Sequence, residues 1–161
     1  MELLTITDAQ LNRAKELFEF KKLNNSITEG DGNLAGALGE ILMVDKLSGK
    51  QANTFDYDII VKGVFIDVKT KRFTAKFTPN KNWNLNIPDF NTTQKCDYYC
   101  FVGMSDDYQR AYFYGFIKRE DFYKNAVFGK SGAIDPNGNG SWRYRADCYN
   151  LLISALKPTL Y

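Results

Sequence analysis

The residue types best suited to chemistry are two aspartates and a lysine, Asp58, Asp67 and Lys69, which lie in one short segment of the chain. Two carboxylates held side by side repel each other unless a cation lies between them. Oxygen ligands of this kind suit Mg²⁺ or Mn²⁺. The segment therefore predicts a metal site, provided that the elements carrying the two aspartates bring them together.

This segment has the pattern of a β-hairpin. Apolar runs at 59–61 and 64–66 flank a Lys-Gly dipeptide. A two-residue loop with glycine between β-branched runs is typical of a tight turn, because glycine supplies the positive φ that the turn needs. Counting outward from the loop places Asp58 opposite Asp67, with their Cβ atoms roughly 4.5–5.5 Å apart.

Strand alternation adds a lysine to the same face, because Lys69 follows Asp67 by two residues. Two opposed carboxylates with a lysine beside them are unfavourable for stability alone, so the arrangement indicates a site. The alternative interpretation is structural. The same register places Asp56 opposite Lys69, and these two side chains would then form an ordinary cross-strand ion pair on a solvated face.

A third carboxylate, Glu40, precedes the hairpin on a helix expected from about 33 to 47. It is the only polar side chain in LAGALGEILMV, residues 34–44, and a helix that is apolar all round is buried on several sides. Gly36 and Gly39 each lower helix stability by roughly 1 kcal/mol relative to alanine, which a close approach of helix and sheet would explain. Burial of an unpartnered carboxylate is unfavourable, so Glu40 is expected either to project towards the metal or to emerge at a solvated gap.

A basic stretch overlaps the hairpin and continues beyond it. Between 62 and 81 there are six lysines or arginines and one acid, with aromatic residues interleaved. This composition suits contact with the phosphates and bases of a nucleic acid, and it also fits a solvated edge strand protected by lysines. A second alternation of basic and aromatic residues, at 141–145, is expected to form a strand. The candidate nucleic-acid contacts are Lys71, Arg72, Lys76, Lys81, Trp83, Arg143 and Arg145.

Composition limits the remaining classes of function. The 161 residues contain no histidine and three cysteines without metal-ligand spacing. This excludes Ser-His and Cys-His nucleophiles and His-ligated zinc, and it argues against a disulfide framework. The length and the 44% hydrophobic content predict one soluble domain over 1–161. No segment approaches the roughly 20 apolar residues of a membrane span, and the amino terminus lacks a signal-peptide pattern. A cytoplasmic location and no membrane partner are expected.

The whole chain predicts an α/β domain with a central mixed sheet flanked by helices. The expected order is two helices, a hairpin, two strands, a helix and a strand. Outside the hairpin and the helix that carries Glu40, the predicted elements are a helix capped by Thr7–Gln10 and reaching about 23, a polar loop at 24–33, an extended loop at 78–95, strands at 96–102 and 110–117, a helix at 118–127 and a loop at 131–141.

These motifs resemble those of the PD-(D/E)XK nuclease superfamily. Asp58, then eight residues, then the D-x-K triplet 67–69 is similar to the paired motifs that the family carries on adjacent strands, with tyrosine in place of the proline before the first aspartate. The Gly-x-x-Gly-Glu helix that carries Glu40 looks like the accessory first motif. The back half looks like small, often phage-encoded members, and Gln94 and Tyr98 echo the Gln-x-x-x-Tyr motif of the exonuclease branch.

The resemblance implies a restriction-endonuclease-like fold and hydrolysis of DNA phosphodiester bonds with Mg²⁺ or Mn²⁺. Asp58 and Asp67 would hold the metal, with Glu40 and the backbone carbonyl of Val68 as further ligands, and Lys69 would orient or help to deprotonate the attacking water. An endonuclease, structure-specific or resolvase-like, is favoured over an exonuclease. The alternative is a catalytically inactive nucleic-acid-binding module that keeps the fold. A phage-encoded member would act in the host cytoplasm, and a homodimer is one of the oligomeric states left open.

Overall fold

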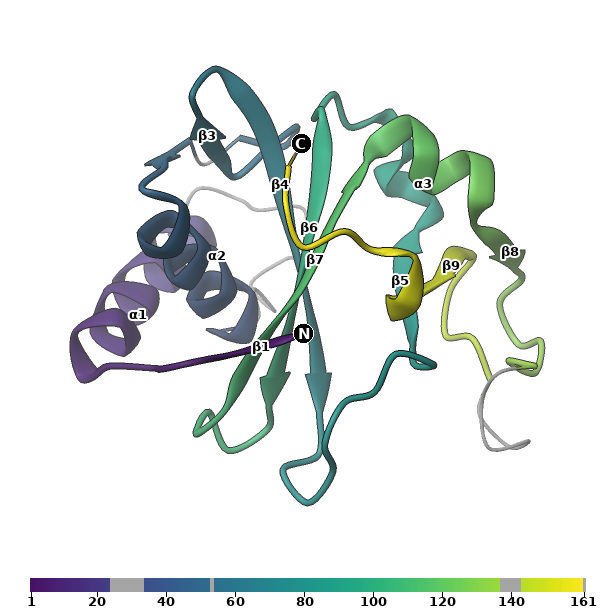
Figure 1. Cartoon of the computed structure of the whole chain (residues 1–161), viewed down its shortest axis with the longest axis horizontal. Coiled ribbons are helices and arrows are strands. Elements are labelled where there is room, and N and C mark those ends of the chain that lie inside the picture. Colours follow the sequence, from purple (N-terminus) through teal and green to yellow (C-terminus); the bar gives the residue numbers. More distant parts are fainter. Residues whose placement is uncertain (24–33, 53, 137–142, 161) are drawn as a thin grey trace.

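The fold is given by a computed structural model, which describes residues 1–23, 34–52, 54–136 and 143–160. They form three layers (Figure 1): α1 and α2 cover one face of a six-stranded sheet, and a three-stranded sheet with α3 covers the other. The expectation of an α/β domain with a mixed sheet is confirmed. The helices are α1 (Asp8–Leu23), α2 (Leu34–Leu47) and α3 (Arg119–Asn125), with the short 3₁₀ helices η1 (Asp89–Thr93) and η2 (Ile153–Ala155).

The large sheet has the strand order β1-β7-β6-β4-β3-β2. Its strands are β1 (Glu2–Leu4), β2 (Lys50–Gln51), β3 (Ile59–Val61), β4 (Val64–Phe73), β6 (Tyr98–Ser105) and β7 (Ala111–Lys118). The β4–β6 pair is parallel, and the other pairs of this sheet are antiparallel. Parallel neighbours need a crossover connection of a dozen or more residues. Here that connection contains β5 and η1 in place of a long helix.

The small sheet has the order β5-β9-β8 and is antiparallel. Its strands are β5 (Asn84–Pro88), β8 (Val127–Gly129) and β9 (Cys148–Leu152). Leu85 and Ile87 of β5 pack with Tyr99 and Phe101 of β6 in one apolar core, which joins the two sheets. The prediction of an extended loop at 78–95 was wrong, because the Asn-Leu-Asn-Ile alternation that begins at Asn84 is a strand pattern with asparagines on its second face.

The two local predictions near the amino terminus and at the hairpin are confirmed. Thr7 Oγ1 accepts a hydrogen bond of 3.2 Å from the Gln10 N–H, and Gln10 Oε1 accepts one of 3.0 Å from the Thr7 N–H, which is a capping box. In the hairpin, Ile59 pairs with Ile66 and Val61 pairs with Val64, as counted from the sequence. The two turn residues between them have φ values of 50° and 83°, the positive values of a tight hairpin turn.

The strand β4 presents two chemically different faces. Ile66 and Val68 pack in the core that includes residues of α2, and Thr70 lies against Gly39 of that helix. Successive side chains of a strand point to opposite faces. Asp67 and Lys69 therefore point away from α2, towards the small sheet, on the face where their β6 neighbours Tyr99 and Phe101 contribute to the core with β5.

The remaining predictions have mixed outcomes. The strands expected at 96–102 and 110–117 correspond to β6 and β7, and the helix expected at 118–127 corresponds to α3. The strands β1, β2 and β8 are only two or three residues long and were not predicted. The loop predicted at 24–33, and positions 137–142 of the predicted loop and strand, lie outside the described residues. No helix in the described ranges combines the length and the apolar character needed to cross a bilayer.

We expect Gly39→Ala to destabilise the protein by about 1–3 kcal/mol, because the added Cβ would overlap Oγ1 of Thr70 where α2 touches β4. Gly36→Ala is the matched control. Nothing lies within 4 Å of its added Cβ, and alanine is favoured over glycine in a helix by roughly 1 kcal/mol, so this variant should be more stable. Urea unfolding measures both changes. Equal effects at the two glycines would contradict a close helix–sheet contact at Gly39.

Candidate active site

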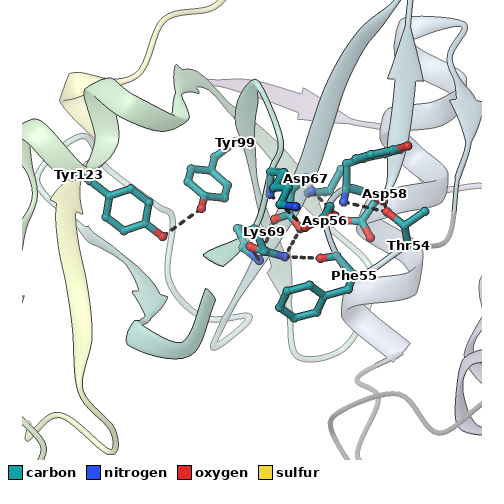
Figure 2. A network of polar contacts seen from close by, with 12 residues as sticks. Thr54, Phe55, Asp56, Asp58, Asp67, Lys69, Tyr99 and Tyr123 are labelled. Carbon is teal, nitrogen blue, oxygen red and sulfur yellow. Dashed lines mark hydrogen bonds and ion pairs between the residues drawn. The ribbon is translucent and has the colours of Figure 1, made fainter. Parts of the chain in front are cut away.

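Asp67 lies at the centre of a buried polar cluster on β4 (Figure 2). It is 3% exposed. Its Oδ1 accepts a hydrogen bond of 2.8 Å from Gln94 Nε2, and its Oδ2 forms an ion pair of 2.7 Å with Lys69 Nζ. Lys69 Nζ also donates to Gln94 Oε1 at 3.1 Å. The three side chains thus contact one another pairwise, and the two oxygens of Asp67 have different partners.

Asp58 reaches this cluster from the segment before β3. Its backbone N–H donates to the Ile66 carbonyl at 3.0 Å, so the regular hairpin pairing ends at Ile59. Its carboxylate is buried and accepts a hydrogen bond of 2.8 Å from the backbone N–H of Val68. Asp58 therefore does not lie directly opposite Asp67, as the hairpin counting predicted. Its carboxylate instead binds the backbone of Val68, the residue that follows Asp67 on β4. Val68 contributes that N–H, while its side chain packs in the core.

The charges of the two aspartates interact. Burial, followed by the nearby charge of Asp58, raises the pKa of Asp67 to about 6, although Lys69 and Gln94 act in the opposite direction. The ordinary pKa is 3.8, so the folded state binds a proton more tightly than the unfolded chain does. The contribution of this group to stability is therefore lost as the pH rises through the interval between these two values.

Asp56 does not form the ion pair that the structural interpretation required. Its Oδ1 accepts a hydrogen bond of 3.1 Å from the backbone N–H of Lys95, while Lys69 pairs with Asp67. Lys69 Nζ also lies over the ring of Tyr99, 5.8 Å from its centroid. The cluster thus continues along β6, where the Tyr99 hydroxyl is 3.0 Å from a tyrosine hydroxyl of α3 (Figure 2).

Gln94 organises the site, although the set of site residues predicted from the sequence did not include it. Its Nε2 donates to Asp67 Oδ1 and to the Phe55 carbonyl, both at 2.8 Å, and its Oε1 accepts from Lys69. One buried amide therefore ties the segment before β3, the strand β4 and the end of η1 together. The signal that could have found it is the resemblance of Gln94 and Tyr98 to a Gln-x-x-x-Tyr motif.

Glu40 lies on the other side of β4. It is buried on α2 next to Gly39, and Gly39 lies against Thr70, on the face of β4 opposite Asp67. Within the described ranges of the chain, no three His, Cys, Asp or Glu side chains gather in a group that could hold a metal ion. The structure therefore brings Asp58 and Asp67 together but does not assemble the predicted set of three carboxylates.

The predicted nucleic-acid contacts fall into an inward and an outward group. Lys71 turns inward: its Nζ donates to the backbone carbonyl of Asn84 and lies 3.5 Å from Asn86 Oδ1, and burial lowers its pKa. Trp83 is half-buried and packs edge-on against Phe73, with 6.1 Å between ring centroids. The side chains on the outside are those of Arg72, Lys76, Lys81, Arg143 and Arg145.

Arg143 has a local structural contact of its own. Its Nη1 donates to the carbonyl of Gly132 at 2.7 Å, and its backbone forms an isolated bridge with Ile134. The predicted strand at 141–145 is thus represented, among the described residues, by this bridge alone. Arg143 is exposed, and a guanidinium group has five N–H donors, more than this one contact uses.

Comparison of the chain with protein-family models and with curated proteins gave no match. The interpretation of its chemistry therefore depends on the contacts of Asp67, Asp58, Lys69 and Gln94.

Proposed function

We propose that the chain is a metal-dependent nuclease that hydrolyses DNA phosphodiester bonds, with an endonuclease favoured over an exonuclease. The observation that supports this most is the buried contact of Asp67 with Lys69, with Asp58 close enough to raise the pKa of Asp67. A buried acid whose pKa is shifted by desolvation and by a second acid is a common property of functional sites. The resemblance to PD-(D/E)XK motifs supports the same proposal.

The two aspartates fit a divalent cation. Carboxylate oxygens are the ligands that Mg²⁺ and Mn²⁺ prefer, and a cation beside Asp58 and Asp67 would offset the charge interaction between them. These two side chains would hold the metal, with the Val68 carbonyl as a further ligand that the resemblance implies. Glu40, on the other side of β4, is left out of this ligand set. When bound, the metal supplies positive charge that polarises the phosphoryl group.

Lys69 is proposed to act on the water and on the phosphate. In the hydrolysis, the water oxygen forms a bond to phosphorus, one P–O ester bond breaks, and a water proton ends on the leaving oxygen. Lys69 Nζ is held by Asp67 Oδ2 and Gln94 Oε1. An ammonium group fixed in this way can donate a hydrogen bond to the oxygen on which negative charge develops, without reorganising during the reaction.

A non-catalytic nucleic-acid-binding module is the second candidate, and two observations favour it. No group of three metal-ligating side chains gathers in the described part of the chain, and the Lys69 ammonium already balances the charge of Asp67. In that case the contacts of the cluster hold β4 and the segment before β3 together. Nucleic acid would then bind elsewhere on the protein without being cut.

A panel of substrates tests the proposal directly. Linear duplex, nicked, flapped and four-way-junction DNA, single-stranded DNA and RNA are each incubated with the protein in Mg²⁺ and in EDTA. The proposal expects Mg²⁺-dependent cleavage of at least one DNA substrate. Binding without cleavage of any of them would favour the second candidate, and neither binding nor cleavage would contradict both.

The outward cations give the proposed DNA path. Arg72 is exposed near the end of β4, about 16 Å along the strand from Asp67 at the usual rise. Its side chain points to the opposite face of the strand, so the proposed path passes around this end of β4. Lys76 follows in the adjoining loop and is exposed. Lys71 does not belong to this path, because its ammonium group is directed to the carbonyl of Asn84.

The double variant Arg72→Ala/Lys76→Ala is expected to weaken DNA binding and to reduce the slope of log K against log salt by about 1.8, since each lost phosphate contact lowers it by roughly 0.9. Fluorescence anisotropy over a salt series, in EDTA, measures this slope. Lys124→Ala/Lys130→Ala is the matched control, because it removes two exposed charges around α3 and β8. A slope that changes equally in both variants, or in neither, would contradict the proposed path.

A further inference from the structure

Two phenylalanine rings are exposed beside the carboxylate cluster. Phe55 is 44% exposed and Phe65 is 36% exposed. Phe65 precedes Asp67 by two residues on β4, so the two side chains share one face of the strand. Its ring stacks on that of Tyr57, with 4.5 Å between centroids and 28° between planes. The two rings therefore present apolar surface to solvent beside the carboxylate cluster, where a bound ligand can cover it.

The position of Phe55 is fixed by the site itself. Its carbonyl accepts a hydrogen bond from Gln94 Nε2, the same amide nitrogen that donates to Asp67 Oδ1. Thr54 Oγ1 donates to the Tyr57 carbonyl at 2.7 Å and accepts from the Tyr57 N–H at 3.0 Å, which closes a turn around Phe55. Figure 2 shows the Phe55 ring beside Asp67 and Lys69, at the edge of the cluster.

An aromatic ring held next to a site that acts on DNA can stack on a nucleobase. Every base has a π-face, so stacking of this kind tolerates any sequence. In a duplex, however, both faces of each base are covered by its neighbours. Only an unpaired nucleotide can present a face to a ring at the site, as bases in single strands and loops do when they stack on aromatic side chains.

We infer that the substrate is DNA that is unpaired at the cleaved phosphate, a single strand or a single-stranded flap, whose base stacks on Phe55. This inference rests on the proposed function. The stacked pair of Phe65 and Tyr57 gives a second apolar surface, which lies two residues before Asp67 on the same face of β4. Phe55 is thus a specificity-determining residue, and the aspartates and Lys69 remain the reacting groups.

Binding of matched oligonucleotides in EDTA tests this without cleavage. Fluorescence anisotropy compares a labelled single strand with its duplex for wild type, Phe55→Ala and Phe55→Leu. We expect both variants to bind the single strand about 5- to 150-fold more weakly, the range that corresponds to loss of one stacked base, and to bind the duplex as wild type does. Leucine keeps an apolar side chain without a π-face, so a merely structural role would spare Phe55→Leu.

Phe128→Ala is the matched control. Phe128 is 48% exposed, like Phe55, but it lies on β8 of the small sheet, where it packs against Tyr149. The Phe128→Ala variant should bind both oligonucleotides as wild type does, and thermal melts should show that all variants are folded. Equal weakening on single strand and duplex, or no weakening in Phe55→Ala, would overturn the inference. Mg²⁺-dependent cleavage of duplex DNA with unchanged binding in both Phe55 variants would overturn it while leaving the proposed nuclease activity in place.

Discussion

Replacing Asp67 by asparagine is expected to abolish Mg²⁺-dependent DNA cleavage, with a loss of about 10³-fold or more, because one metal-ligating carboxylate supplies several kcal/mol of transition-state stabilisation. DNA binding should persist, since no basic residue is removed. Asparagine keeps an oxygen that can accept the hydrogen bond from Gln94 Nε2, so the fold around the site should remain. Single-turnover cleavage of whichever substrate the panel identifies, with binding measured in parallel, provides the readout.

Asp56→Asn is the control for this change. Asp56 is a neighbouring carboxylate in the same segment, and its Oδ1 accepts a hydrogen bond from the backbone N–H of Lys95. Asparagine can accept the same hydrogen bond, so this variant removes one negative charge near the site without touching the proposed ligands. It should cleave at close to the wild-type rate. Near-normal cleavage by Asp67→Asn, or an equal loss in both variants, would contradict the assignment of Asp67.

Local signals in the sequence were sufficient for the start of the first helix and for the hairpin that leads into the site. The Thr7–Gln10 capping box and the hairpin turn each depend on a few adjacent residues, and both were predicted with the correct partners. The glycine at 39 was expected to allow a close approach of helix and sheet, and its contact with Thr70 confirms this. Gly36 has no such neighbour, so the same argument was wrong there.

Non-local geometry could not be read from the same residues. A helix that is apolar all round, such as α2, does not reveal which of its sides meets the sheet. The sequence therefore left open whether Glu40 lies on the same side of β4 as the two aspartates. Strand alternation resolves it once Thr70 is seen to touch Gly39. Likewise, hairpin counting predicted Asp58 opposite Asp67, but the backbone shifts at Asp58, whose N–H binds the Ile66 carbonyl.

The small sheet and Gln94 were missed for a related reason. Asn84 and Asn86 resemble loop residues in sequence. The residues that alternate with them, Leu85 and Ile87, nevertheless complete the core between the sheets. Gln94 follows this segment and reaches Asp67 only because the crossover between β4 and β6 returns it to the site. Its side chain is polar and uncharged, so composition alone gave no reason to select it.

Mg²⁺ is expected to raise the melting temperature of the wild-type protein. At 100 times Kd, a ligand that binds the folded state alone stabilises it by about 2.7 kcal/mol, which for a chain of this size corresponds to roughly 5–10 °C. The melts are best recorded at pH 7.5 in EDTA and in Mg²⁺, because the pKa of Asp67 is about 6 and protons then do not compete with the metal. Absence of any Mg²⁺-dependent shift would contradict the metal site.

The variant Asp58→Asn separates a metal site from a structural carboxylate pair. Asparagine can still accept the hydrogen bond from the Val68 N–H, but the charge that raises the pKa of Asp67 is gone. The variant should therefore be more stable than wild type in EDTA and should lose most of the Mg²⁺-dependent gain. If the pair were structural, removing the charge would leave both proteins insensitive to Mg²⁺. Glu40→Gln then distinguishes the ligand sets: a retained shift assigns the metal to the two aspartates alone, and a lost shift shows that α2 also supplies a ligand.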